Sequence, residues 1–343
     1  MIKDPKISFC IPTYNRGNKV FELVKNILQY EENDIEVLVL DNFSTDNTIE
    51  LLTKIDDSRF RLVRNEKNLG GIQNPYKALS IGNGSFCFLC LDKDFINHQF
   101  IYELIQRLEK EKDIVFGHCI LNSKKETTDV VFEKGFQSIY NMSYLSGHPS
   151  GMFYKKDFFV KTKALNEVFK TNEIFGFQFE LINAEMALSG KSLLINLPIF
   201  STETKDECAK TTSFTYKNEE DVFFSPKKQL KTFQIYCNHL YNLELSSGEK
   251  KLIIKKILKQ FLLSSTIGYK QIMKDNFICQ HYHLKPKNIS IVKLISIYIN
   301  FFISFLRSDF DRSILNKLSL FLSVNFNMIF SLVQNKIATN NGK

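Results

Sequence analysis

The sequence lacks three features that would place a protein outside the cell or across a membrane. Its first residues, MIKDPKISFC, include no apolar segment of signal-peptide length, and Pro12 interrupts the first hydrophobic run. Its seven cysteines are an odd number at irregular spacing, which is typical of a reducing cytosol rather than of a disulfide framework. No stretch offers the roughly 20 clean apolar residues that a spanning helix needs. We therefore expect an unsecreted, cytoplasmic protein.

Two groups of cysteine and histidine could be read as metal or redox sites. Cys87 and Cys90 form a C-x-x-C pair, but residues three apart on a strand point to opposite faces of a sheet. Cys279, His281 and His283 could ligate a metal, yet no second ligand cluster accompanies them. Core or surface roles are the favoured interpretation for both groups, with a redox pair or a zinc site as the alternative.

Charge is distributed unevenly along the 343 residues. Residues 1–224 carry 27 Lys and Arg against 32 Asp and Glu, a net of −5, whereas residues 225–343 carry 18 against 5, a net of +13; together these give the overall +8. We predict two domains with these limits. A basic C-terminal region on an acidic body favours an anionic partner, such as a membrane surface or nucleic acid.

Three C-terminal segments are rich in apolar residues, at 250–263, 289–306 and 315–333. The first is predicted to be a cationic amphipathic helix, and polar residues such as Lys293 and Asn300 interrupt the others. Helices lying in the plane of an anionic bilayer fit this pattern, and the alternative is a helical subdomain or a dimer interface. Nucleic acid is not expected as a partner, because no binding motif is present and arginine is scarce there.

The first hundred residues alternate between strand and helix patterns. Short apolar runs at 6–11, 36–40, 59–63 and 85–91 predict strands, and helical periodicity at 17–30, about 46–55 and 74–82 predicts the connections. Such alternation is typical of a parallel sheet covered on both faces. Further along we expect a helix near 98–112, a strand near 113–120, a helix near 176–190 and mostly helix from 226 onward.

Polar residues gather where these predicted strands end, at 12–16, 41–46, 64–65 and 92–94. Because right-handed crossovers place the carboxyl ends of parallel strands along one edge, we expect these four segments to meet there. The last of them, LCLDKDF at 89–95, takes an apolar strand directly into Asp92 and Asp94. Paired carboxylates suit Mg²⁺ or Mn²⁺ beside a diphosphate. The alternative is a turn with two solvated acids.

These segments resemble the family 2 glycosyltransferases with the GT-A fold over about residues 6–96. The resemblance is carried by PTYNR at 12–16, by VLVLDNFSTDNT at 37–48, by VRNEKNLGG at 63–71 and by the Asp-x-Asp pair. It implies a Rossmann-like, mostly parallel sheet sandwiched by helices, followed by a mainly α-helical region. It also implies a metal-dependent, inverting transfer from a nucleotide-sugar to a glycan or lipid-linked acceptor in bacterial surface-polysaccharide synthesis, with a UDP-sugar favoured as donor.

The resemblance assigns roles to individual positions. The implied nucleotide-binding residues are Pro12, Thr13, Tyr14, Arg16, Asp41, Arg64, Asn68, Gly70, Gly71 and Asp92. Among them Tyr14 would lie against the base, Asp41 would hydrogen-bond the base or ribose, and the glycines would let the backbone approach. Asp92 would reach the ribose or the water shell of the metal, and Asp94 would ligate Mn²⁺ or Mg²⁺ directly.

The general base is the least defined part of the implied site. The family places it in an E-D-like motif at the start of a helix, and no such pair occurs in residues 173–191, where Glu180 and then Glu185 are the nearest acids. We expect Glu180 to serve. His148, in SGHPSG, is a second candidate on the acceptor side, and that segment together with FSP at 224–226 resembles the abequosyltransferase-like branch of the family.

Two other functions fit parts of the sequence. Since the E-D pair is missing, a catalytically degenerate subunit that binds or scaffolds is one alternative. A sugar-phosphate nucleotidyltransferase has a related sheet, but it would need a glycine-rich basic loop after the first strand, and PTYNRGNK does not provide one.

Overall fold

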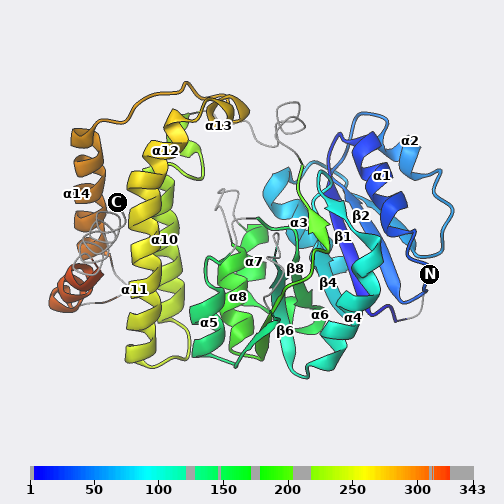
Figure 1. Ribbon diagram of the computed structural model, residues 1–343, viewed down its shortest axis with the longest axis horizontal. Helices are drawn as coiled ribbons and strands as arrows, with labels where there is room; N and C mark the ends of the chain where they lie inside the picture. Colours follow the sequence, from blue (N-terminus) through cyan, green and yellow to red (C-terminus); the bar gives the residue numbers. More distant parts are fainter. Residues whose placement is uncertain are drawn as a thin grey trace, which may run out of the picture. The chain divides into compact units, whose positions relative to one another are not determined.

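The computed structural model describes residues 4–120, 128–145, 148–170, 178–203, 218–308, 311 and 313–324. The chain divides into two compact units, the first formed by the described residues up to 203 and the second by those from 218 onward (Figure 1). The domain limits predicted above, 1–224 and 225–343, remain a prediction.

An eight-stranded sheet forms the centre of the first unit, in the order β3-β2-β1-β4-β8-β6-β9-β7. Four neighbouring strands are parallel: β3 (Phe60–Arg64), β2 (Ile35–Asp41), β1 (Ile7–Thr13) and β4 (Phe86–Leu89). In the other half β6 (Ile114–Cys119) and β9 (Lys191–Ile195) are parallel, while β8 (Met152–Lys155) and β7 (Val130–Phe132) run antiparallel to their neighbours. The mostly parallel sheet predicted from the sequence is confirmed.

Helices cover both faces of this sheet. On one face lie α1 (Gly17–Ile27) and α4 (Ile101–Lys110). They share a hydrophobic core with every second residue of the strands, such as Phe9 and Val37. On the other face lie α3 (Gly70–Ile81), α6 (Lys156–Phe159) and α8 (Phe179–Ala187), which contact the strands, with α7 (Lys163–Lys170) and α5 (Phe136–Met142) against α8. Two short helices, α2 (Thr48–Leu52) and η1 (His98–Phe100), complete the connections.

The structure departs from the predicted elements in the details of their ends. Helix α3 begins at Gly70, four residues earlier than predicted, and the φ of +80° at Gly70 explains why glycine stands there. Strands β7 and β8 fall between residues 120 and 176, where no element was predicted. A two-stranded ribbon, in which β5 (Phe95–Ile96) pairs with β10 (Phe200–Ser201), was also missed, because strands of two residues carry no periodic signal.

The second unit is helical, as predicted. Its elements are η2 (Glu219–Asp221), α10 (Pro226–Tyr241), α11 (Ser247–Leu263), a π-helical turn η3 (Ser264–Gly268), α12 (Tyr269–Lys274), α13 (Asn276–His281) and α14 (Ile291–Arg307). The apolar side of α11 is buried in this unit, where Phe261 lies 5.5 Å from Phe233 of α10 between ring centroids. The cationic amphipathic helix predicted at 250–263 therefore packs as part of a subdomain.

The cysteine and membrane expectations can be compared with the described residues. Cys10, Cys87, Cys90, Cys119, Cys237 and Cys279 are free thiols buried in the protein, which agrees with their interpretation as core residues. No helix in the described part of the chain has both the length and the apolar character needed to cross a bilayer.

Candidate functional site

The carboxyl ends of the parallel strands stand level with one another. Thr13 is in register with Asp41, and Asp41 with Arg64, so three of the four predicted polar segments meet at one edge of the sheet. The fourth follows β4, where a backbone hydrogen bond of 3.0 Å from Asp94 to Leu91 closes a turn that contains Asp92. The convergence expected from the sequence is present.

Asp92 ties this turn to β1. One of its oxygens accepts a hydrogen bond of 2.8 Å from the Thr13 hydroxyl, and the other accepts one of 2.5 Å from Arg16. The carboxylate is almost fully buried. A charge-assisted contact on each oxygen fixes its orientation, so Asp92 connects the PTYNR segment to the aspartate turn.

Asp94 is arranged differently. Its side chain is buried, and Oδ2 accepts a hydrogen bond from the Ser150 hydroxyl and lies 3.4 Å from His148 Nε2. Oδ1 is also buried but has no hydrogen-bond partner among the described residues. Burial raises the pKa of Asp94 to about 6, although Ser150 and Lys93 act in the opposite direction. An unsatisfied buried carboxylate oxygen is costly, and in native proteins it is commonly a place where an ion or ligand binds.

The segment that reaches Asp94 comes from the start of β8. Ser150 accepts a hydrogen bond of 2.9 Å from the backbone N–H of Leu91, and its own N–H donates to His148 Nδ1 at 3.2 Å. Burial lowers the pKa of His148 to about 4. The ring is therefore neutral near pH 7, and its approach to Asp94 is not an ion pair.

Asp41 organises the second predicted segment. It is fully buried, accepts from the backbone N–H of Ser44 at 3.0 Å and lies 3.3 Å from Arg64 Nε. The Arg64 guanidinium, on a half-exposed side chain, also lies over the ring of Phe43 at 5.0 Å. Contact between Asp41 and a ligand would thus require the Arg64 side chain to move.

An asparagine network joins the remaining segments. The side-chain amide of Asn42 donates to Asn68 Oδ1 at 2.9 Å and to the Gly70 carbonyl at 3.2 Å. Its oxygen accepts from Asn65 at 3.0 Å and from the backbone N–H of Leu69 at 2.8 Å. Asn42 therefore shapes the turn that leads into α3, a function that its position after Asp41 did not reveal.

Aromatic side chains are exposed along this edge. Tyr14, predicted to lie against a base, is 42% exposed, and Phe43 and Phe95 are 42% and 50% exposed. Large exposed aromatic rings beside buried carboxylates are suited to stacking on planar ligand groups. Phe43 and Phe95 were not among the residues selected from the sequence, although they lie within the segments 37–48 and 89–95.

The two helix acids have separate surroundings. Glu180 lies in the first turn of α8, is 2% exposed and accepts a hydrogen bond of 3.0 Å from the backbone N–H of Tyr144. Glu185 accepts from the backbone N–H groups of Lys163 and Ala164, at the start of α7. Glu185 is thus a helix cap, which leaves Glu180 as the candidate base. Residues 171–177, directly before α8, lie outside the described residues.

Glu203 is an acid near the site that sequence reasoning missed. It follows β10, pairs with Lys19 of α1 and contributes to the raised pKa of Asp94. The only sequence signal would have been its position after an apolar run, NLPIF, which is too weak to single it out.

The opposite edge of the sheet also holds a buried carboxylate, that of Glu36. Glu36 accepts four hydrogen bonds, from Ser8 at 2.5 Å, from Arg61 at 2.7 Å, and from the backbone and side chain of Asn83 at 2.7 and 2.8 Å. Burial alone would raise the pKa of Glu36, but these donors outweigh it, so the pKa is lowered. We call these four residues the Glu36 cluster.

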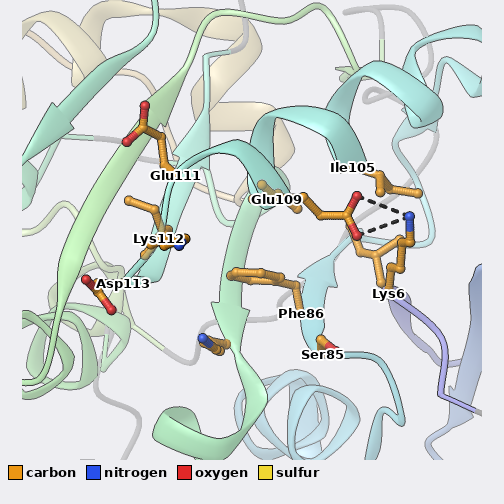
Figure 2. A pocket seen from close by; sticks show the side chains of 12 residues that line it. Lys6, Ser85, Phe86, Ile105, Glu109, Glu111, Lys112 and Asp113 are labelled. Atoms are coloured by element: carbon orange, nitrogen blue, oxygen red, sulfur yellow. Dashed lines mark hydrogen bonds and ion pairs between the residues drawn. The ribbon is translucent and has the colours of Figure 1, made fainter.

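A hollow of about 450 Å³ opens on the same side as the Glu36 cluster, at the amino ends of β1, β4 and β6 (Figure 2). Its lining includes the apolar side chains of Phe86 and Ile105 and an ion pair of 3.1 Å between Lys6 and Glu109. Its lining includes both cations, such as Lys112 and Lys155, and anions, such as Glu111 and Asp113. It lies away from the polar strand ends and is separate from the candidate site.

The donor set at the carboxyl edge fits a hard divalent cation. Mg²⁺ is usually bound in enzymes through one or two carboxylates, with water and phosphate oxygens completing its shell. Asp94 offers a buried oxygen of this kind, and Asp92 stands next to it with its oxygens directed to Thr13 and Arg16. No group of three His, Cys, Asp or Glu side chains with metal-binding geometry occurs in the described part of the chain. A dedicated all-protein metal cage is therefore not present there.

Comparison with known proteins identifies relatives of this chain. The glucosyltransferase GalNAc(5)-diNAcBac-PP-undecaprenol beta-1,3-glucosyltransferase of Campylobacter jejuni is 27% identical over 177 residues, covering 49% of this chain and 57% of that protein. Abequosyltransferase RfbV of Salmonella typhimurium is 35% identical over 126 residues, covering 35% of this chain and 36% of that protein. The matches thus span less than two thirds of these relatives.

Solved structures show the same fold. Residues 1–349 of Staphylococcus aureus TarS superpose with a TM-score of 0.60 at 15% identity, covering 88% of this chain and 80% of that one. A structure of the same TarS fragment in complex with UDP gives a TM-score of 0.60 as well, at 16% identity. The GT-A architecture implied by the sequence is therefore confirmed.

A family model extends this likeness over half of the chain. The model of glycosyl transferase family 2 matches residues 8–180, which run from β1 through the Asp92–Asp94 turn to the first turn of α8. Every described residue assigned above to the nucleotide, the metal and the base lies within that range. The protein belongs to glycosyl transferase family 2.

Proposed function

We propose that the protein is a metal-dependent, inverting glycosyltransferase that moves a sugar from a nucleotide-sugar to a glycan or lipid-linked acceptor. The observation that carries the proposal is the Asp94 carboxylate, buried at the strand-end edge with one oxygen lacking a partner among the described residues. Bacterial surface-polysaccharide synthesis is the proposed setting, because the similar proteins include an abequosyltransferase and an undecaprenol-linked glucosyltransferase.

The donor nucleotide would lie along the ends of β1, β2 and β3. Tyr14 and Phe43 supply exposed rings for stacking on the base, and Arg64 would swing away to open Asp41 to a base N–H or a ribose hydroxyl pair. Thr13 and Arg16 hold Asp92 toward the ribose. We favour UDP as the nucleotide, since TarS, similar in fold, has been solved with UDP and with UDP-GlcNAc.

Asp94 would hold the cation, and Asp92 would bind it through a water molecule. A bound Mg²⁺ or Mn²⁺ neutralises charge that develops on a departing diphosphate. The protein contributes the orientation of both carboxylates, because Asp92 is fixed by two donors and the second oxygen of Asp94 is held by Ser150.

The transfer itself exchanges two bonds at the anomeric carbon. An acceptor hydroxyl oxygen forms a bond to that carbon while its bond to the diphosphate oxygen breaks, and the nucleoside diphosphate leaves with the bonding electrons. A carboxylate must take the hydroxyl proton. We propose Glu180, at the start of α8, for that role.

The acceptor is proposed to be at an anionic membrane surface, which α14 would touch. Its exposed side includes Ile291, Val292, Ile295, Ile299 and Ile303, each 40–77% exposed. Lys293, Asn300 and Arg307 recur every seven residues, so they share a neighbouring polar strip, and this helix contains no acid. An apolar strip bordered by cations is the arrangement of helices that lie in anionic bilayers.

The membrane proposal is tested by sedimentation with vesicles. The double substitution Ile295→Asp and Ile299→Asp should abolish binding to phosphatidylglycerol vesicles, whereas Tyr102→Asp on α4, also an exposed apolar position, should leave it intact. Two results would contradict the membrane proposal. One is an equal loss of vesicle binding in both variants, and the other is binding of the unmodified protein to phosphatidylglycerol vesicles that is no stronger than its binding to neutral vesicles. If the unmodified protein does not bind vesicles but self-associates, and the double substitution abolishes that self-association, α14 is an oligomer interface instead.

Two assays test the enzymatic proposal. Calorimetric titration of UDP with and without Mn²⁺ measures the site, and release of nucleoside diphosphate from a panel of activated sugars measures transfer. Metal-dependent UDP binding without any diphosphate release, for every donor and acceptor tried, would favour a binding or scaffold subunit instead. Formation of pyrophosphate from a nucleoside triphosphate and a sugar phosphate would indicate a nucleotidyltransferase.

A further inference from the structure

The loop of residues 148–151, which precedes β8, contacts the Asp92–Asp94 turn through the side chains of Ser150 and His148. It reaches that turn from 56 positions away in the sequence, because β8 lies beside β4. Ser150 is fully buried, so its hydroxyl serves no solvent-facing purpose. This loop is not part of the four motifs that carry the family resemblance.

The hydrogen bonds of Ser150 have only one consistent assignment. The backbone N–H of Leu91 donates to Ser150 Oγ at 2.9 Å, so the hydroxyl acts there as the acceptor. Its single proton is then directed to Asp94 Oδ2. Leu91 and Asp94 lie at the two ends of the aspartate turn, and one serine side chain therefore holds both.

His148 presents a hydrogen to the same oxygen. Its Nδ1 accepts the backbone N–H of Ser150 at 3.2 Å and so carries no hydrogen itself, which places the ring hydrogen on Nε2, 3.4 Å from Asp94 Oδ2. Both groups thus stand at Oδ2, whereas Oδ1 has no hydrogen-bond partner among the residues that the structure describes. The two oxygens of one carboxylate are sharply distinguished.

We propose that Ser150 and His148 are positioning residues that hold Asp94 by Oδ2 and leave Oδ1 as the oxygen that binds the divalent cation. The inference rests on the proposed metal-dependent function and refines it. It also assigns His148 a place beside the metal ligand rather than contact with the acceptor. Partners of this kind fix the rotation of a ligating carboxylate, and their loss commonly reduces metal affinity by about 10–100-fold.

The backbone around the loop is built to keep it in place. Gly151 has a φ of +90°, donates from its N–H to the Leu89 carbonyl at 3.1 Å and accepts from the N–H of Cys119 at 2.9 Å. A Cβ at this position would lie 2.3 Å from the Phe200 ring. The loop is therefore pinned between β4, β6 and the β10 ribbon strand, which allows a small hydroxyl to define the geometry of Asp94.

The test compares Mn²⁺ affinity in matched serine variants. Electron paramagnetic resonance of free Mn²⁺, titrated with protein and saturating UDP, should give a dissociation constant about 10–100-fold weaker for Ser150→Ala than for the unmodified protein. Ser138→Ala removes another fully buried hydroxyl of the same unit, which contacts Ser192 at 2.5 Å, and should leave the constant unchanged. UDP affinity without metal should be the same in all three proteins.

A second pair of variants keeps the result interpretable if Ser150→Ala does not fold. His148→Gln retains an N–H near Asp94 and should keep most of the Mn²⁺ affinity, whereas His148→Leu should lower it. An unchanged Mn²⁺ affinity in Ser150→Ala would overturn the positioning role and leave the proposed function standing. If Ser150→Ala does not fold, an unchanged Mn²⁺ affinity in His148→Leu has the same meaning. Absence of Mn²⁺-dependent UDP binding in the unmodified protein would instead overturn both.

Discussion

Two buried carboxylates at opposite edges of one sheet differ in how completely their hydrogen bonds are satisfied. Glu36, at the amino edge, receives four hydrogen bonds and has a lowered pKa. Asp94, at the carboxyl edge, keeps one oxygen without a partner among the described residues and has a pKa raised to about 6. Burial therefore accompanies complete hydrogen bonding at one edge, whereas at the other it leaves a carboxylate oxygen that the proposed function assigns to the cation.

The largest expected effect is on the function of the carboxyl edge. Asp94→Asn should remove the metal-dependent part of UDP affinity and lower turnover about a thousandfold, which corresponds to about 4 kcal/mol in the barrier. Titration of UDP with and without Mn²⁺, followed by a diphosphate-release assay, measures both. If Mn²⁺ still increases the UDP affinity of the variant, Asp94 is not the metal ligand, and the contrast with Glu36 is wrong.

A further buried carboxylate, that of Glu180, extends the comparison to the proposed base. Glu180→Gln should lower kcat by about 10²–10⁴-fold and leave UDP affinity unchanged, because the amide cannot accept the acceptor proton. Glu185→Gln is the matched control on the same helix, since that carboxylate caps α7. It should reduce thermal stability with little change in kcat. Equal kcat values for the two variants would assign the base elsewhere, with Glu203 the next candidate.

Glu36 should behave in the opposite way to Asp94. Glu36→Gln removes the charge and turns one acceptor into a donor that faces its own hydrogen-bond donors, so it should lower the free energy of unfolding by about 2–3 kcal/mol. UDP affinity below the melting temperature should not change. Denaturant unfolding and calorimetric titration of one preparation measure both quantities. A large loss of UDP affinity in the folded Glu36→Gln variant would show that the amino edge of the sheet also contributes to nucleotide binding.

The contribution of Glu36 should also depend on pH in a defined direction. Its pKa is lowered from an ordinary value of 4.5, so the folded state favours the ionised form. The stabilisation is present above the unfolded pKa and disappears as the pH falls through the lower, folded value. Melting curves of the unmodified protein and Glu36→Gln should therefore differ at pH 7 and converge in acid below about pH 4.5. Curves that diverge on acidification would refute the assignment.

The smallest expected effect is a gain of stability at Asp94. In Asp94→Asn the amide oxygen can still accept from Ser150, and the NH2 group replaces the unpartnered oxygen, so the main change is loss of the buried charge. This should raise the melting temperature of the metal-free variant, with a gain of about 1 kcal/mol in the free energy of unfolding. The matched amide substitutions would then shift stability in opposite directions. Differential scanning fluorimetry with a chelator present measures the shift. A lower melting temperature for this variant would indicate that Asp94 is structural, like Glu36.

The predictable part of the site is the part built on consecutive parallel strands. Thr13, Asp41, Arg64 and Asp92 each follow an apolar strand, and the rule that such strand ends share an edge was enough to bring them together. Local sequence could not place Ser150, because its contact with Asp94 depends on β8 lying antiparallel beside β4. The strand MFYK is too short to show a period, and a turn-rich stretch precedes it.

The C-terminal helices show a different limit. Lysines and apolar residues alternate in α11 as they would in a helix at a bilayer, but its apolar side is buried within the second unit. The sequence predicts that one face of a helix is apolar, but it does not predict whether protein or lipid covers that face. The sequence also carried no sign that the isoleucines of α14 would remain exposed while the apolar side of α11 is buried.

The seam between β4 and β8 has a consequence for protein engineering. A chimera that takes its donor-binding strands from one parent and the rest of the sheet from another would be joined along this seam. Ser150 crosses it to hold both ends of the aspartate turn. Residues 148–151 should therefore be inherited together with the donor strands. If Ser150 has the positioning role proposed above, a hybrid without them should bind its nucleotide normally and bind the divalent cation weakly.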